Sequence, residues 1–329
     1  MLTAGPVGRV SFGLLMALPL VLFPTFASPY ALNVLIMILI YSVFAMSLDL
    51  LMGYAGLPSF GHAAFFGIGA YAAALVALHI SASLWLTLGV ASAVALLAAL
   101  LIGVLSIRAG GLYFVMLTLA LSQLIYAYAV GAAEFAGGSN GLPGIPRPTL
   151  APVPFVVDFW DRSSIYYLVL IFFVASFFFL RSVVLSPFGR ALVGARENDR
   201  RMHGLGYATW RYKLGGFVLA GTVAGGAGAF YVYYRGFVSP ELLYWTTSGL
   251  AAVMVIVGGA GTLLGPVVGA ALFVMLQDIA SSYTEWWQSI LGIIFIFIVY
   301  FMRKGVVGFA ARYLPAHLAR SNFRRSAGV

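Results

Sequence analysis

The chain has 329 residues, of which 62% are hydrophobic and only 8% are charged, with a formal net charge of +9 and no cysteine. So apolar a composition excludes an ordinary soluble domain and indicates a polytopic membrane protein. The lack of cysteine excludes disulfides, thiolate metal sites and cysteine nucleophiles.

Long apolar runs follow one another along the whole chain. A hydrocarbon layer of about 30 Å is crossed by about 20 helical residues, so this length can supply roughly ten spans. The runs are continuously apolar and do not alternate as barrel strands do, which predicts one all-α membrane domain over residues 1–329. The first run could instead be a signal peptide cleaved near Ala27. The expected spans are 10–26, 31–52, 60–78, 84–107, 112–132, 165–180, 214–234, 246–260, 263–280 and 286–302.

Basic residues are distributed unequally between the two sets of loops. With the amino terminus in the cytoplasm, fifteen of the 18 Lys and Arg residues fall on the inner side, and Arg147, Arg162 and Arg235 fall outside. Positively charged loops are retained in the cytoplasm during insertion. Both termini are therefore expected in the cytoplasm. The positive charge follows mostly from topology, so nucleic acid is an unnecessary partner and membrane lipid phosphates are the nearer one.

Polar residues within the spans are costly, and two of them stand out as candidates for the substrate path: Asp49 and Gln123. Asp49 could equally lie at the cytoplasmic interface, and Gln123 could serve an interhelical hydrogen bond. Glycine-rich stretches at 53–61 and 258–265 interrupt the apolar sequence, and broken helices can offer free amides and carbonyls to a zwitterion. Their glycines could also simply let helices pack closely. The candidate path residues are Asp49, Gly53, Gly56, Gly61, Gln123, Gly258, Gly261 and Gly265.

Two loops and the carboxyl-terminal tail are longer than plain connectors. The extracytoplasmic loop 133–164 contains five prolines, which favour turns and extended segments, and it could form a docking surface or a loosely ordered cap. The basic tail 303–329 is expected in the cytoplasm, either on anionic lipid or disordered.

The inner loop 181–213 holds nine of the 27 charged residues of the chain. Good helix formers between 189 and 202, with Pro187 just ahead and glycines after, predict one short helix across the cytoplasmic face. Such a helix could pass force from an attached motor to the spans. The alternative is a solvated loop that only fixes topology.

Several runs, taken together and in this order, resemble a known family over about residues 31–308. They are GYAGLPSFGHAAFFGIGAY from Gly53, GGLYFVMLTLALSQLI from Gly110, GGSNGL from Gly137, GRALVGARENDRRMHGLG from Gly189 and VSPELLYWTTSGLAAVMVIVGGAGTLLGPVVGA from Val238. The set is similar to the LivM-type subunit of the branched-chain amino acid class of ATP-binding cassette importer permeases.

The resemblance implies a multi-pass subunit in the bacterial inner (plasma) membrane that works by alternating access. Its partners would be a second permease subunit, two cytoplasmic ATP-binding subunits and a periplasmic or extracellular substrate-binding protein. The segment 189–206 would be the coupling element, although it keeps only Asp199 of the general Glu-Ala-Ala pattern. The expected coupling residues are Gly189, Arg190, Arg196, Glu197, Asn198, Asp199, Arg200 and Gly204.

No cofactor is expected on this chain, and ATP and Mg would be held by the partner ATPases. Neither Lys213 nor Lys304 follows the glycine-rich turn of a phosphate-binding loop, and the four histidines lack metal-ligand spacing, so we expect a transport subunit and no enzyme. Leucine, isoleucine and valine are the expected cargo, with urea or short amides as the alternative. An ion-coupled carrier or channel would need charged residues deep in the spans, where this sequence has almost none.

Overall fold

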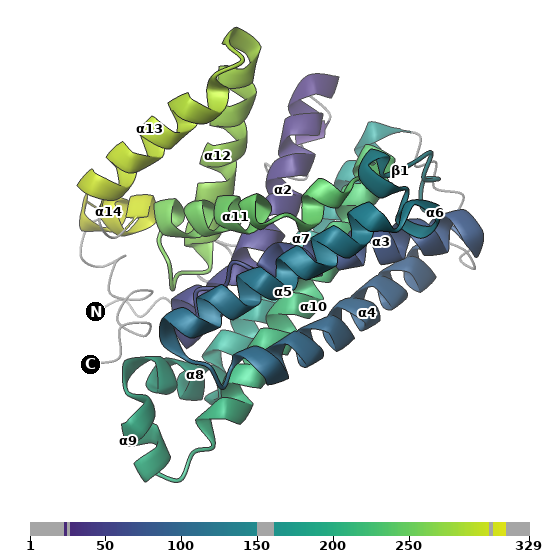
Figure 1. Cartoon of the computed structure of the whole chain (residues 1–329). Helices are drawn as coiled ribbons and strands as arrows, with labels where there is room; N and C mark the ends of the chain where they lie inside the picture. Colours follow the sequence, from purple (N-terminus) through teal and green to yellow (C-terminus); the bar gives the residue numbers. More distant parts are fainter. Residues whose placement is uncertain (1–22, 25–26, 150–160, 303–304, 314–329) are drawn as a thin grey trace, which may run out of the picture.

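A computed structural model describes residues 23–24, 27–149, 161–302 and 305–313 of the chain as a bundle of helices (Figure 1). Within these residues, eight helical stretches are long and apolar enough to cross a membrane. The expected span 10–26 lies almost wholly outside the described residues. The spanning elements are α2 (Pro29–Asp49) continued by η1 (Leu50–Ala55), α3 (His62–His79), α4 (Leu84–Ser106), α5 (Gly111–Gly131), α7 (Arg162–Leu185), α10 (Thr209–Arg235), α12 (Leu264–Tyr283), and α13 (Trp287–Phe301) with α14 (Gly305–Tyr313).

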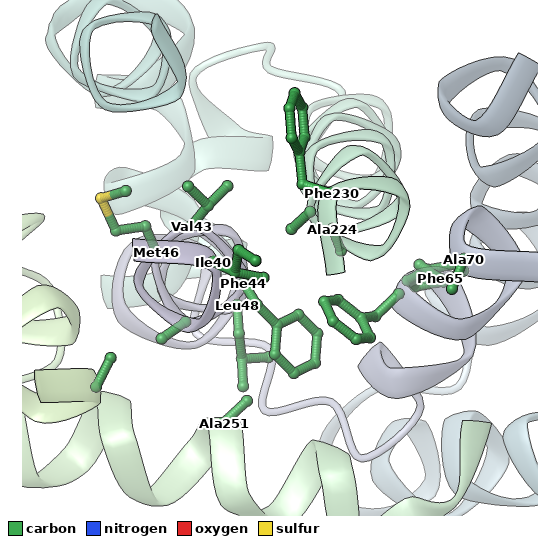
Figure 2. Packing of buried hydrophobic residues seen from close by; sticks show 14 of the residues in the cluster. Ile40, Val43, Phe44, Met46, Leu48, Phe65, Ala70, Ala224, Phe230 and Ala251 are labelled. Atoms are coloured by element: carbon green, nitrogen blue, oxygen red, sulfur yellow. The ribbon is translucent and has the colours of Figure 1, made fainter. Parts of the chain in front are cut away.

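The centre of the bundle is α2, which packs against α7, α10, α11 (Trp245–Gly258) and α12. In the most apolar stretch of α2 and η1, 78% of the residues are buried, against 22% for α5 and for α7. Figure 2 shows side chains of α2, including Phe44, packed toward Phe65 of α3, Phe230 of α10 and Ala251 of α11. The outer helices carry the surface that a hydrocarbon layer would cover.

Small residues bring α3 and α10 into close contact. A Cβ added at Gly69 would collide with the backbone of Gly225, and one at Gly228 would collide with the backbone of Phe66. These glycines therefore allow the two helices to pack closely.

The expected span 246–260 is short in the sequence and short in the structure. Its helix, α11, has 14 residues, about 21 Å at about 1.5 Å per residue, which does not reach across a layer of about 30 Å. The chain reaches α11 through β2 (Phe237–Val238) and the 3-10 helix η3 (Pro240–Leu243), which packs against α3 and α5. Irregular backbone at membrane depth requires such cover by protein.

The described part of the loop 133–164, residues 133–149 and 161–164, lies at the end of the bundle opposite α8 (Pro187–Glu197) and α9 (Asp199–Gly204) (Figure 1). It contains α6 (Ala133–Ala136), η2 (Gly138–Asn140) and β1 (Leu142–Pro143), which pairs antiparallel with β2. The prediction of turns and extended segments is confirmed for the described part, with short helical pieces in addition. Residues 150–160 of this loop, and all of the 303–329 tail except 305–313, lie outside the described residues.

Candidate functional site

The charged inner loop is mostly helical. Helix α7 runs to Leu185 and α10 begins at Thr209, so both membrane helices extend further than predicted. The prediction of one helix over 189–202 is wrong at Asn198, whose extended backbone (φ −156°, ψ 94°) separates α8 from α9. The Asn198 side chain accepts a hydrogen bond from the Arg201 amide at 2.9 Å. This residue therefore ends one helix and caps the next.

Helix α8 is anchored on the bundle. Ser186 accepts a hydrogen bond from the Gly189 amide and Pro187 follows it, a common way to start a helix. One face of α8 is buried against α7, α10 and η1. Leu192 on that face is fully buried and contacts Gly216 of α10. The buried residues of α8 are Gly189, Ala191, Leu192 and Ala195.

Helix α9 has no buried residue and projects away from the bundle (Figure 1). It is held at its start by an ion pair between Asp199 and Lys213 at 3.1 Å. Burial acts to raise the pKa of the Asp199 carboxyl, but hydrogen bonds from Lys213 and Thr209 and the nearby positive charge outweigh it, so the pKa is lowered. The carboxylate is therefore charged at neutral pH.

The expected coupling residues fall into two groups. Gly189 is buried in the anchor of α8, whereas Arg190, Glu197, Arg200 and Gly204 are exposed. Arg196 is exposed as well, but its guanidinium reaches back into the bundle and donates a hydrogen bond to the Gly53 carbonyl.

The first glycine break adjoins α2. Its last turns, η1, are π-helical, a form found mostly as short insertions that often mark functional positions. Gly56 follows in the left-handed conformation (φ 69°), and α3 begins at His62. Gly56 lies directly on the Arg196 side chain, so a Cβ there would meet its methylene carbons. The predicted break at 53–61 is therefore present, and α8 covers it.

The second glycine break separates α11 from α12. Gly259 (φ 121°) and Gly261 (φ 79°) have conformations that favour glycine, and α12 begins at Leu264. The Gly261 amide donates a hydrogen bond to Asp49 Oδ1 at 2.7 Å. Gly258 and Gly265 pack so closely that neither has room for a Cβ.

The two breaks therefore meet beside α8. We call the set Asp49, Gly53, Arg196 and Gly261 the junction. A Cβ on Gly53 would collide with the Asp49 carboxylate and with the Gly261 backbone, so glycine is required at this point of contact. Asp49 itself is fully buried, and its Oδ2 has no hydrogen-bond partner among the described residues.

Two expected path residues contact a different part of the bundle. Gly61 lies against the Thr118 carbonyl of α5. Gln123 of α5 has a buried Nε2 without a hydrogen-bond partner in the described part of the chain. The structure therefore divides the predicted path set: most of it lies at or next to the junction, whereas Gly61 and Gln123 lie at α5.

A buried polar cluster at the start of α3 was not singled out from the sequence. His62 Nε2 lies 2.8 Å from Ser47 Oγ, and its ring stacks on Phe44 at 5.5 Å between centroids. Ser248 of α11 accepts a hydrogen bond from the Ala63 amide at 2.7 Å, satisfying one of the free donors at the helix start. The only sequence signal for this cluster is that its polar residues, such as Ser47 and Ser248, lie inside expected spans. Among the described residues, no group of three or more His, Asp or Glu side chains could hold a metal ion.

Comparisons with known proteins agree with these features. Residues 30–299 match the model of the family described as branched-chain amino acid transport system / permease component. Two relatives carry the name high-affinity branched-chain amino acid transport system permease protein LivM. The one from Salmonella typhimurium is 28% identical and the one from Escherichia coli K12 is 27% identical, over 306 residues that cover 87% of this chain and 72% of each relative. No solved structure matches the chain.

These matches and the eight membrane-crossing stretches in the described residues identify a multi-pass protein of the inner membrane. Its relatives are permease proteins, so it is a transport subunit and not an enzyme. With residues 30–299 covered by a single family model, the chain belongs to the permease component family of branched-chain amino acid transport systems.

Proposed function

We propose that the chain is one permease subunit of an ATP-driven importer that moves leucine, isoleucine and valine across the inner membrane by alternating access. The family match and the names of the two relatives support the system and the cargo. The observation that carries the mechanism is the division of the inner loop into an anchored α8 and an α9 that has no buried residue.

We assign α9 as the element that docks into a partner ATPase. It projects beyond the bundle and carries exposed charges, among them Arg200 and Arg201. Two ATPase subunits would hold ATP and Mg, and this chain would bind neither. A second permease subunit would complete the membrane part, and a substrate-binding protein would deliver cargo to the opposite face.

The contacts between loops support a cytoplasmic location for α8 and α9. Segments expected outside pair with one another: β1 with β2, and Ser83 with Thr149. Segments expected inside also meet one another, as Asp49 does with Gly261 and Arg196 with Gly53. A topology with one of these loops on the other side would break these pairings.

The test is reconstitution of the chain with its cognate subunits in proteoliposomes. We expect uptake of radiolabelled leucine that requires ATP inside and the binding protein outside. Competition with unlabelled valine and with urea separates the amino acid cargo from the alternative. Uptake by this chain alone, or uptake that an ionophore abolishes and ATP does not drive, would refute the proposal and favour an ion-coupled carrier.

A further inference from the structure

The junction connects the inner loop to both glycine breaks through one arginine. We infer that it acts as a latch: Arg196 positions η1 against the 259–263 loop and transmits movement of α8 to both breaks. This inference rests on the proposed function, since it needs an ATPase that moves α8. It assigns Arg196 a role within the membrane domain, whereas the sequence suggested a contact with the ATPase.

The chemistry of the Arg196 guanidinium and the Gly53 carbonyl supports this role. An arginine side chain has five N–H donors, is always charged and accepts no hydrogen bond, so it suits a carbonyl left free by a helix irregularity. Gly53 lies in the π-helical turn and presents such a carbonyl to Arg196. Hydrogen bonds with one charged partner are roughly twice as strong as neutral ones. Arg196 therefore holds the first break directly to α8.

Asp49 extends the connection to the second break. Its Oδ1 accepts the Gly261 amide, which belongs to the loop between α11 and α12. Its Oδ2 is buried and has no hydrogen-bond partner among the described residues. Asp49 thus links the end of α2, next to the turn that Arg196 binds, to the loop before α12.

The close packing makes the movement of the parts interdependent. Gly53 has no room for a side chain between Asp49 and Gly261, and Gly56 lies on Arg196. Gly305 of α14 in turn lies against Gly259. A displacement of α8 that draws Arg196 away from Gly53 therefore releases η1 from the 259–263 loop. In the conformation described, the two breaks are held together at the end of the bundle that carries α8.

The test compares variants within the complete importer. Arg196→Gln removes the charge, Arg196→Lys keeps the charge without the planar fork, and Arg108→Gln removes an exposed arginine from the turn after α4. We expect Arg196→Gln to co-purify with the ATPases and to hydrolyse ATP, while uptake per ATP falls about tenfold, as for loss of a charged hydrogen bond. Arg196→Lys should recover part of the lost uptake per ATP, and Arg108→Gln should show the same uptake per ATP as the wild type.

Hydrogen exchange provides a second measurement on the same complexes. Arg196→Gln should speed exchange in the peptides that cover 50–61 and 258–265 and leave α9 unchanged. If Arg196→Gln no longer co-purifies with the ATPases, Arg196 is an ATPase contact. If uptake per ATP hydrolysed and hydrogen exchange are both the same as in the wild type, no latch exists. Either result overturns the inference and leaves the proposed function intact. If the wild-type complex shows no uptake, the proposed function itself is wrong.

Discussion

At the level of single residues, side-chain chemistry decides which part of the protein Arg196 serves. It is one of several charged residues in α8 and α9, and sequence position alone gives it the same role as Arg190 or Arg200. Its guanidinium, however, donates a hydrogen bond to the carbonyl of Gly53, which lies 143 residues away in the chain. The sequence supplied both partners but not the pairing, because the pairing depends on how α8 lies against η1.

Asp199 gives a pH-dependent prediction. Its lowered pKa means that the ion pair with Lys213 stabilises the folded state above the ordinary carboxyl pKa of about 4 and loses this contribution as pH falls through the lowered value. The carboxylate is about half exposed, so the pair is worth about 0.5 kcal/mol.

We therefore expect Asp199→Asn to unfold at a slightly lower temperature than the wild type at neutral pH, with the difference shrinking as the pH falls below about 4. Thermal unfolding of the detergent-purified chain at several pH values measures it. A difference that grows on acidification would contradict the assignment of the ion pair.

At the level of elements, the cap at Asn198 is expected to keep α9 separate from α8. Asn198→Ala removes the acceptor for the Arg201 amide, a loss of about 1 kcal/mol for a typical cap. We expect faster hydrogen exchange in α9 and weaker co-purification with the ATPases, while α8 keeps its protection. Asn198→Asp, which retains a capping oxygen, is the control, and equal behaviour of the two variants would show that the cap has no such role.

The packing of α3 on α10 gives a prediction with a matched control. Gly69→Ala places a methyl group against the Gly225 backbone, whereas Gly89→Ala on α4 meets nothing within 4 Å. Overpacking costs about 1–3 kcal/mol, so Gly69→Ala should lower the unfolding temperature and Gly89→Ala should leave it unchanged or raise it. Equal unfolding temperatures would mean that α3 and α10 are not in close contact.

Sequence reasoning located the breaks in the helices better than it described their form. Glycine and proline marked both breaks, since these residues interrupt apolar runs visibly. The π-helical turn of η1 and the 3-10 helix η3 ahead of α11 were not predictable in the same way, because both depend on backbone groups finding partners in other elements. Gly261 meets Asp49 from 212 residues away, and η3 is covered by α3 and α5. The boundary between α8 and α9 was missed because Asn198 alone gives a weak signal.

At the level of the whole molecule, the charge distribution and the contacts group the loops in the same way. The distribution of lysine and arginine put the loops before α3 and before α12 inside with 181–213, and these loops meet at the junction. The loops expected outside meet through β1 and β2 at the opposite end. The contacts show which loops share an end of the bundle, and the assignment of one end to the cytoplasm stays a prediction from the charge distribution.

The lack of cysteine makes this topology directly testable, since single cysteines can be introduced without removing others. Suitable exposed positions are Ser139 and Glu285, expected outside, and Leu205, expected inside. A charged maleimide that cannot cross the membrane should label Ser139→Cys and Glu285→Cys on intact spheroplasts and should label Leu205→Cys only after permeabilisation, because the bilayer separates the two faces. Labelling of Leu205→Cys from outside would place α9 away from any cytoplasmic ATPase, and the coupling role of α8 and α9 would have to be abandoned.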